Sequence, residues 1–160
     1  MKPFAEFLKE QASKDPQNKV ERKKREWLSS VERLIAQARQ WLDESDRETK
    51  VLRIVVDENH SVEEQEFGKY NIPCLQIWLG KKVVELRPIA RNVAGGIGQG
   101  GLHIPAQGQV DITDRKRKIV IYRIKKEHDQ DRWTILDPDQ DIVSELDRTT
   151  FEAAVQSLLE

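Results

Sequence analysis

The sequence of 160 residues has little cysteine, methionine or histidine: one Cys, one Met and three His. The single cysteine, Cys74, excludes an internal disulfide and any zinc site built on four cysteines. No stretch approaches the roughly eighteen apolar residues that a membrane-spanning helix needs. The N-terminal stretch MKPFAEFLKE also lacks the apolar segment of a signal peptide. We therefore expect no membrane association and a cytoplasmic location.

A strong charge of one sign is absent as well. Lys and Arg number 27 and Asp and Glu number 28, so the formal net charge is −1. This balance provides no overall field that would draw the chain to nucleic acid or to a membrane. The charges are nevertheless uneven, because a basic segment, 115–126, precedes a mostly acidic one, 127–160. The two segments either face each other across the fold or orient a partner.

Glycine is scarce outside residues 94–108, which hold six of the eight glycines. Gly96, Gly98 and Gly101 have the G-x-G-x-x-G spacing of a dinucleotide-binding loop. Such a loop binds phosphate because a helix begins at its last glycine, whereas Leu-His-Ile-Pro and another glycine follow here. We therefore expect no cofactor and a long, exposed and mobile loop between strands. The side chains through which that loop would contact a partner are Leu102, His103 and Ile104.

The N-terminal third has the pattern of helix. Pro3 suits a first helical turn, and Asp15 followed by Pro16 is an N-cap with proline at the first helical position. From there to about Leu42, apolar residues recur with the helical period. This stripe consists of Val20, Trp27, Leu28, Val31, Leu34, Ile35, Ala38, Trp41 and Leu42. It predicts a long helix that buries its three seven-spaced side chains, Trp27, Leu34 and Trp41, against a sheet.

Strand and cap signals follow. The expected strands cover 51–56, 73–79, 83–90, 109–113, 119–124 and 132–136. Ser61 and Glu64 have the register of a capping box, and Gly68 follows as a stop, which predicts one short helix. A second capping pattern, Thr149 with Glu152, predicts a short C-terminal helix. Its apolar face would be Phe151, Ala154, Val155, Leu158 and Leu159.

These elements predict an α+β fold. A long N-terminal helix packs on a mostly antiparallel sheet of five or six strands, and a short C-terminal helix closes the structure. No internal repeat or low-complexity linker divides the chain, so we expect a single domain over 1–160. Its parts are a helical segment at 1–45, a β-rich core at 51–137 and the C-terminal helix at 148–160.

Residues 51–87 resemble the second half of a thioredoxin fold. The resemblance consists of a strand that ends at Asp57, a short helix, Pro73 before a second strand and a glycine at a hairpin turn. Such a resemblance implies a redox protein. The sequence has no Cys-x-x-Cys motif, and the long helix leaves no room for the strand that a thioredoxin requires before this segment. We therefore expect no redox activity.

One acidic segment has Asp137, Asp139 and Asp141 at alternate positions, as in a calcium loop. An EF-hand loop needs glycine at its sixth position and glutamate at its twelfth, and the sequence has Ile142 and Arg148 there. We interpret the segment as an acidic turn that caps a helix, and we expect no metal site. The histidines lack metal-ligand spacing, and we expect solvated loops at His60, His103 and His128.

Asp57 and the segment Glu85-Leu86-Arg87 follow in part the Asp…Glu-x-Lys pattern of metal-dependent nucleases. Arg87 stands where the lysine should be, and arginine stays protonated at neutral pH and cannot act as a base. A metal-dependent hydrolase is therefore the least favoured alternative. The competing interpretation is that Asp57, Glu85 and Arg87 are simply charged residues on the faces of strands.

Four consecutive bases, Arg115, Lys116, Arg117 and Lys118, lie at a predicted turn. The segment 119–124 that follows is apolar on both faces, which predicts a buried central strand with the bases at its exit. A second basic stretch, 19–26, is interpreted as a solvated face of the long helix. The turn is a candidate contact for a protein or for nucleic acid.

No catalytic motif is complete in this sequence. We therefore expect a non-enzymatic interaction or accessory protein, such as an adaptor, an immunity-type protein or a small complex subunit. Its partner would be another protein, and no small-molecule substrate is indicated. The alternative is a nucleic-acid-associated protein that uses the basic turn at 115–118.

Overall fold

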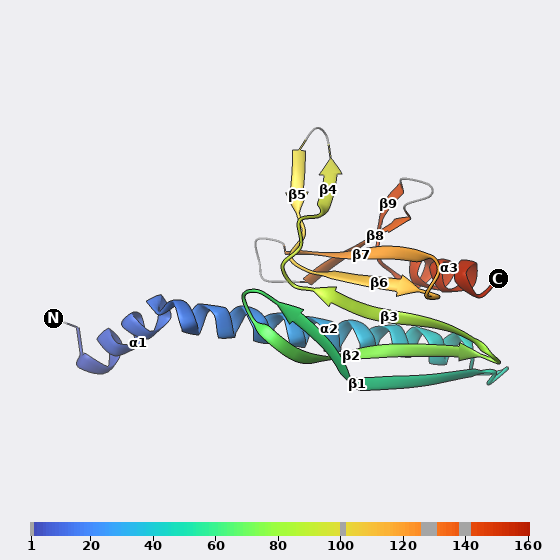
Figure 1. Cartoon of the computed structure of the whole chain (residues 1–160), viewed down its shortest axis with the longest axis horizontal. Helices are drawn as coiled ribbons and strands as arrows, with labels where there is room; N and C mark the ends of the chain where they lie inside the picture. Colours follow the sequence, from blue (N-terminus) through green and yellow to red (C-terminus); the bar gives the residue numbers. More distant parts are fainter. Residues whose placement is uncertain (1, 100–101, 126–130, 138–141) are drawn as a thin grey trace.

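The computed structural model describes residues 2–99, 102–125, 131–137 and 142–160. The fold is α+β, as expected: a long helix lies along a curved antiparallel sheet, and a short helix packs near the C-terminus (Figure 1). The helices are α1 (Phe4–Lys14), α2 (Pro16–Ser45) and α3 (Arg148–Leu159). The strands are β1 (Leu52–Glu64), β2 (Gly68–Leu79), β3 (Lys82–Ala90), β4 (Gly96–Gln99), β5 (Leu102–Pro105), β6 (Gln109–Thr113), β7 (Lys118–Lys125), β8 (Asp131–Asp137) and β9 (Ile142–Glu145).

Helix α2 begins where the sequence predicts. The Asp15 carboxylate accepts a hydrogen bond from the backbone N–H of Gln17 at 3.0 Å, and Pro16 occupies the first helical position. At the other end, the Asp46 carboxylate accepts hydrogen bonds from the N–H groups of Val51 and Leu52, both at 2.9 Å. These bonds fix the turn that leads from α2 into β1.

The apolar stripe of α2 forms one side of the core. Trp27 is fully buried, its ring lies 6.3 Å from that of Trp133, and its Nε1 donates to the Tyr70 hydroxyl at 3.1 Å. Leu34 is buried as predicted. Trp41 is only half-buried and lies against Phe151 of α3, with 5.6 Å between the ring centroids. The stripe therefore packs as expected at two of its three seven-spaced positions.

In the described part of the chain the main sheet has seven strands, in the order β1-β2-β3-β6-β7-β8-β9, instead of five or six. All the pairings are antiparallel. The additional strand is β9. Asp137 ends β8 and Ile142 begins β9, so strands and not a helix flank the acidic segment, whose residues 138–141 lie outside the described part of the chain. The expectation for β7 is confirmed, because this strand lies between β6 and β8 and is mostly buried.

The short helix expected around 61–68 is wrong. These residues continue β1 and turn into β2, with Glu64 paired to Gly68. Val62 and Glu64 are buried while the residues beside them are exposed, which is the alternation of a strand. Gly68 has a φ of +70°, so the glycine serves a turn and not the end of a helix. The helix that the thioredoxin resemblance requires is therefore also missing.

Strand β2 changes the face that it buries along its length. Tyr70 and Ile72 are buried in its first half, and Leu75 and Ile77 are buried in its second half. All four belong to one core cluster, although the two pairs have opposite parity along the strand. The facing register of β1 is irregular between residues 57 and 60. This β1–β2 hairpin therefore twists so that both of its halves contribute to the core.

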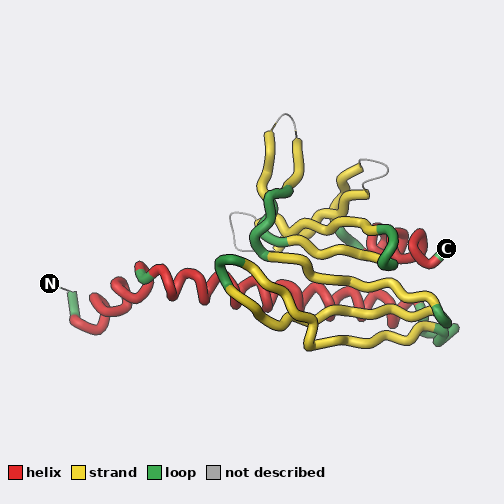
Figure 2. Tube along the Cα trace, in the orientation of Figure 1, coloured by secondary structure: helices red, strands yellow, loops and turns green. Residues whose placement is uncertain are grey.

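The glycine-rich segment is not an open loop. Its described residues form a hairpin of β4 and β5 that projects from the main sheet (Figure 2). Strand β5, and not a helix, follows Gly101. The segment therefore lacks the helix N-terminus that a dinucleotide-binding loop uses to bind phosphate. Two glycines at its ends are needed for packing: a Cβ at Gly95 would lie 2.5 Å from the Tyr122 hydroxyl, and one at Gly108 would lie 2.3 Å from Trp27.

Helix α3 forms as expected, with Phe151, Ala154, Val155 and Leu158 buried. Its capping box uses different residues from those predicted. The Asp147 carboxylate accepts from the N–H of Thr150 at 2.8 Å, and the Thr150 hydroxyl accepts from the N–H of Asp147 at 2.9 Å. Glu152 instead accepts hydrogen bonds from Arg148 and Ser45, so it ties α3 to the end of α2. None of the described helices is long and apolar enough to cross a membrane.

Candidate binding groove

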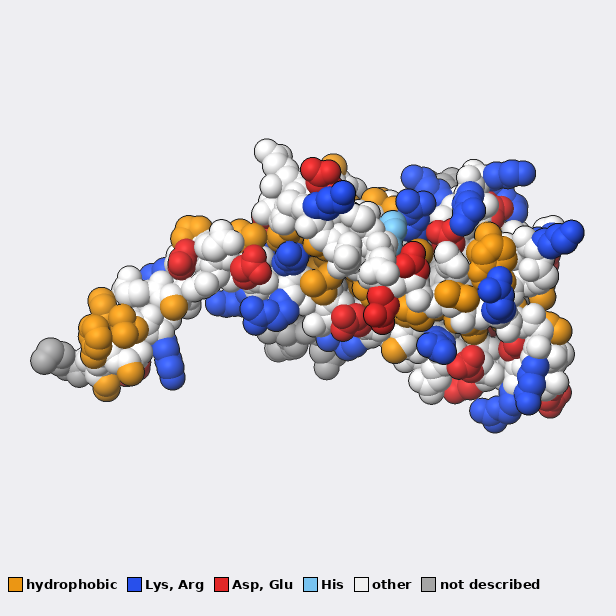
Figure 3. Space-filling view, turned by 60° about the horizontal axis from the view of Figure 1, so that its bottom comes forward, with side chains coloured by type: hydrophobic (Ala, Val, Ile, Leu, Met, Phe, Trp, Pro, Cys, Tyr) orange, Lys and Arg blue, Asp and Glu red, His pale blue; other side chains and the backbone are white. Residues whose placement is uncertain are grey.

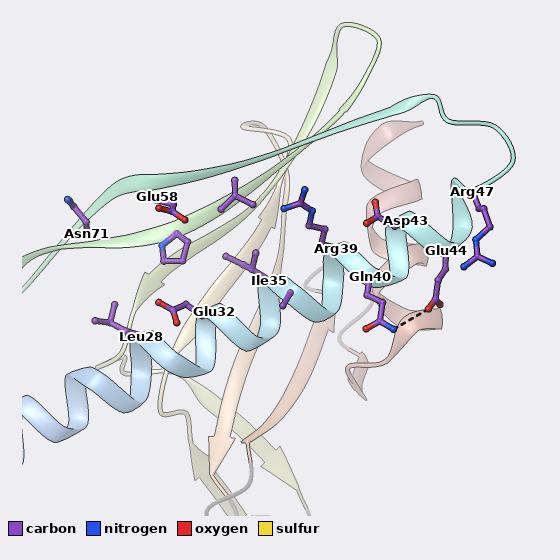
Figure 4. Close-up of a pocket in the computed structure, with 13 residues that line it drawn as sticks. Leu28, Glu32, Ile35, Arg39, Gln40, Asp43, Glu44, Arg47, Glu58 and Asn71 are labelled. Carbon is purple, nitrogen blue, oxygen red and sulfur yellow. Dashed lines mark hydrogen bonds between the residues drawn. The ribbon is translucent and has the colours of Figure 1, made fainter.

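An open groove of about 790 Å³ runs between α2 and the β1–β2 hairpin (Figure 4). Along α2 its lining extends from Leu28 to Arg47, a length of about 28 Å at ~1.5 Å per helical residue. The full lining consists of Leu28, Glu32, Ile35, Ala36, Arg39, Gln40, Asp43, Glu44, Arg47, Val56, Glu58, Asn71 and Pro73. We call this feature the α2–β1 groove. It exists because the β1–β2 hairpin lies over the side of α2 at one edge of the apolar stripe, to which Leu28 and Ile35 belong.

The floor of the α2–β1 groove is apolar. Leu28 and Val56 are half-buried, and Ile35 is 5% exposed. Pro73 of β2 also lines the groove. In this half of β2 the even-numbered residues Tyr70 and Ile72 are buried in the core, and the odd-numbered residues Asn71 and Pro73 therefore face the groove. Ala36 is exposed, and its small side chain leaves the middle of the groove unfilled.

The rim of the groove is mostly acidic. It has four acids, Glu32, Asp43, Glu44 and Glu58, against two bases, Arg39 and Arg47. Figure 4 shows Glu32 on α2 and Glu58 on β1 on opposite sides of the groove. Glu44 accepts from Gln40 at 3.2 Å and pairs with Arg148 at 3.0 Å. For the other three acids, no ion pair is found among the residues that the structure describes.

Helix α1 carries a second uncovered apolar surface. It projects beyond the sheet at the N-terminal end of α2 (Figure 1), and none of its residues is buried. Phe4, Phe7 and Leu8 are 72%, 45% and 49% exposed, and the two phenylalanine rings stack with 6.2 Å between their centroids. Figure 3 shows hydrophobic side chains gathered at this end of the molecule. We call these three side chains the α1 face.

The basic turn forms where the sequence predicts, and all four of its bases are exposed. Two of them already have partners. Arg115 donates to the buried carboxylate of Glu85 at 2.8 and 2.9 Å. Arg117 pairs with Asp114 at 3.2 Å and also donates to the Leu158 carbonyl. The carboxylate of Asp114 accepts from the backbone N–H groups of this turn, which lowers its pKa. The turn is thus held by contacts within the chain.

The residues of the nuclease-like pattern do not form a metal site. Asp57 is exposed and paired across the sheet with Cys74, whose thiol lies 3.9 Å from the Glu85 carboxylate. Burial, and then the negative charge of Glu85, raise the pKa of the Cys74 thiol to about 12. Glu85 itself is bound to Arg115, and Arg87 is exposed. Within the described ranges, no three His, Cys, Asp or Glu side chains are placed to hold a metal ion.

The histidine expectation is wrong at one position. His60 lies in β1 and is half-buried, and its Nε2 donates to the Pro88 carbonyl at 3.1 Å. The backbone of Leu102, His103 and Ile104 lies in β5, and their side chains are outside the described part of the structure. The remaining candidates outside the described residues are His128, Asp139 and Asp141.

The basic stretch 19–26 lies on the N-terminal half of α2, where Arg22 and Arg25 are exposed. Beside them, Asp131 of β8 binds Arg123 at 3.0 Å and Ser30 at 2.9 Å and also pairs with Arg33. Burial alone would raise the pKa of Asp131, but these hydrogen bonds outweigh it and lower that pKa. Asp131 therefore ties β7 and β8 to α2, and its single carboxylate pairs with two of the arginines here, Arg33 and Arg123.

In comparisons with known proteins, the chain matches no family model, no curated protein and no solved structure. The assignment of a function therefore depends on the geometry of the chain itself. The α2–β1 groove was not found from the sequence, because Glu32, Ala36 and Asp43 fit the ordinary pattern of a solvent-facing helix surface. The sequence has no separate signal for the groove, since its apolar residues Leu28 and Ile35 belong to the stripe that is predicted to pack on the sheet.

Proposed function

We propose that this chain is a non-enzymatic interaction protein that binds a segment of a partner protein in the α2–β1 groove. The observation that carries the proposal is the apolar floor under an acidic rim, along about 28 Å of helix at ~1.5 Å per residue. Partner helices are commonly recognised in such grooves through apolar side chains at positions i, i+3 and i+4. The matching segment is amphipathic, with basic residues beside its apolar face.

The rim charges support a basic partner segment. Glu32 and Glu58 face the groove from α2 and β1, and Asp43 lies further along the same helix. Opposite charges across an interface steer association and set orientation. The floor supplies the affinity, since burial of apolar surface contributes about 25 cal/mol per Å².

Nucleic-acid binding through the basic turn is the second candidate. Its support is the common exposure of Arg115, Lys116, Arg117 and Lys118. It is weaker than the groove proposal because Arg115 and Arg117 are already bound within the chain. A gel shift that weakens steeply with salt, and disappears when Lys116 and Lys118 are changed to Gln, would favour this candidate.

The groove proposal is tested by affinity capture from the native cell with three forms of the chain. Ala36→Arg fills the groove at an exposed position, so the fold should be kept. Gln37→Arg is the matched control, because it adds the same charge to the neighbouring helix position outside the groove lining. We expect a protein that is captured by the wild type and by Gln37→Arg, and captured at least about tenfold less by Ala36→Arg, a loss of ~1.4 kcal/mol. Equal capture by all three forms would refute the proposal.

A further inference from the structure

We propose that the α1 face of a second copy of this chain occupies the α2–β1 groove, so that two copies exchange their N-terminal helices. This inference rests on the proposed function and names the partner. Phe4, Phe7 and Leu8 are spaced i, i+3 and i+4, which is the spacing of the anchors of a helix bound in a groove. They are also half of the large exposed hydrophobic side chains found among the described residues; the other three are Val51, Leu79 and Val143.

The α1 face cannot reach the groove of its own chain. Helix α1 ends at Lys14 and α2 begins at Pro16, so a single residue, Asp15, separates the two helices. Two helices need a connection of about two to five residues to fold back as a hairpin. The groove begins further along α2, at Leu28. Helix α1 instead points away from the sheet, where a second molecule can receive it (Figure 1).

The dimensions of the two surfaces agree. Helix α1 has 11 residues, or about 16 Å at ~1.5 Å per residue, and the groove is longer than this. With about 200 Å² for a phenylalanine side chain and the exposed fractions above, each α1 face offers about 300 Å² of apolar surface. Two reciprocal arms, each made of residues 1–15, would then bury about 600 Å² of their own apolar surface, and the groove walls that they cover add to this area.

A local charge match supports this placement. Residues 1–15 carry three lysines and three acids, so the arm has no net side-chain charge. Lys14 follows Phe7 by about two helical turns and therefore lies beside the α1 face, where it can meet an acid of the groove rim. A reciprocal exchange also closes the assembly with two-fold symmetry, so no α1 face and no groove is left open.

Size-exclusion chromatography with light scattering, over a series of concentrations, tests this inference. We expect the wild type to approach twice 18.6 kDa at high concentration. The arm variant, Phe4→Ser with Phe7→Ser and Leu8→Ser, and the groove variant, Ala36→Arg, should each weaken the dimer at least about tenfold. The matched controls, Lys9→Ser on the opposite side of α1 and Gln37→Arg, should dimerise as the wild type does.

Mixing the two variants gives the sharpest result. A pair made of one arm variant and one groove variant keeps one intact arm facing one intact groove. An equimolar mixture should therefore form mixed dimers more readily than either variant forms dimers alone, and a tag on one variant detects them. If a variant does not fold, a peptide of residues 1–15 added to the wild type provides the second measurement, and it should dissociate the dimer.

Three outcomes would overturn the inference. They are a wild type that stays at 18.6 kDa at every concentration, a dimer that neither variant weakens, and a monomer that uses its α1 face to bind lipid vesicles. A monomeric wild type that still captures a different protein in a way that Ala36→Arg prevents would remove the arm exchange and leave the proposed function standing. Loss of that capture difference as well would remove both.

Discussion

Gly108 is the position where a one-carbon change tests the packing of the whole fold. It joins the β4–β5 hairpin to β6 and has a φ of +151°, a conformation that L side chains rarely adopt. A Cβ added there would lie 2.3 Å from Cζ3 of Trp27 and 2.9 Å from two further atoms of the same ring. Trp27 is fully buried and cannot move aside without opening the contact between α2 and the sheet.

Gly108→Ala therefore combines two costs. Holding a residue other than glycine at such a φ costs about 1–3 kcal/mol. Overpacking a filled core costs about 1–3 kcal/mol more, so the free energy of unfolding should fall by roughly 2–6 kcal/mol. For a chain of this size each kcal/mol lowers the melting temperature by about 2–4 °C.

Urea denaturation of a double-mutant cycle measures the two costs separately. In a Trp27→Leu background the ring that meets the new Cβ is gone, and Gly108→Ala should then cost only the backbone part. The coupling energy between the two sites should be about 1–3 kcal/mol. If Gly108→Ala is as stable as the wild type within about 0.5 kcal/mol, the close approach of Gly108 and Trp27, and the position of α2 that depends on it, are wrong.

The remaining predictions concern stability at three other sites. Trp41→Ala should lower the free energy of unfolding by about 1.5–3 kcal/mol. This is less than the ~3–5 kcal/mol expected for a fully buried tryptophan, because the Trp41 side chain is half-buried. An unchanged melting temperature would show that Trp41 does not pack on α3. Arg115→Gln should lower the free energy of unfolding by about 1–2 kcal/mol, because it leaves the buried carboxylate of Glu85 without its partner. The control Lys116→Gln should change that free energy by no more than about 0.5 kcal/mol. Equal effects of the two substitutions in chemical denaturation would contradict the Arg115 contact. Because the pKa of Asp131 is lowered on folding, its contribution to stability is present above about pH 4 and is lost as the pH falls through the lowered pKa. Asp131→Asn should therefore make the melting temperature less dependent on pH below about pH 4, and an unchanged pH profile would contradict this.

Local signals predicted the helices well. The 3.6-residue stripe and the Asp15–Pro16 pair located α2, since both depend only on neighbouring residues. The capping pattern at Ser61 and Glu64 misled, because the same residues alternate in and out of a strand and because Gly68 suits a turn as well as a helix end. Sequence spacing alone does not separate these two readings.

The α2–β1 groove depends on contacts between residues far apart in the sequence. Glu32 and Ala36 become groove residues only because the β1–β2 hairpin twists over that face of α2. The twist follows from the change of buried face between Ile72 and Leu75, and no local pattern reveals it. Similarly, Glu85 was a catalytic candidate in the sequence, and its role as the partner of Arg115 appears only when β3 and the basic turn come together.

Site-specific photo-crosslinking tests the central claim most directly. A benzoylphenylalanine at position 36 lies in the middle of the α2–β1 groove, and one at position 37 lies outside its lining. We predict that illumination in the native cell gives one dominant adduct from position 36 and none from position 37. The attached peptide should be amphipathic with lysine beside its apolar face, and residues 1–15 of a second copy are the specific expectation. No adduct from position 36, or the same adducts from both positions, would contradict the claim that this groove is a binding site.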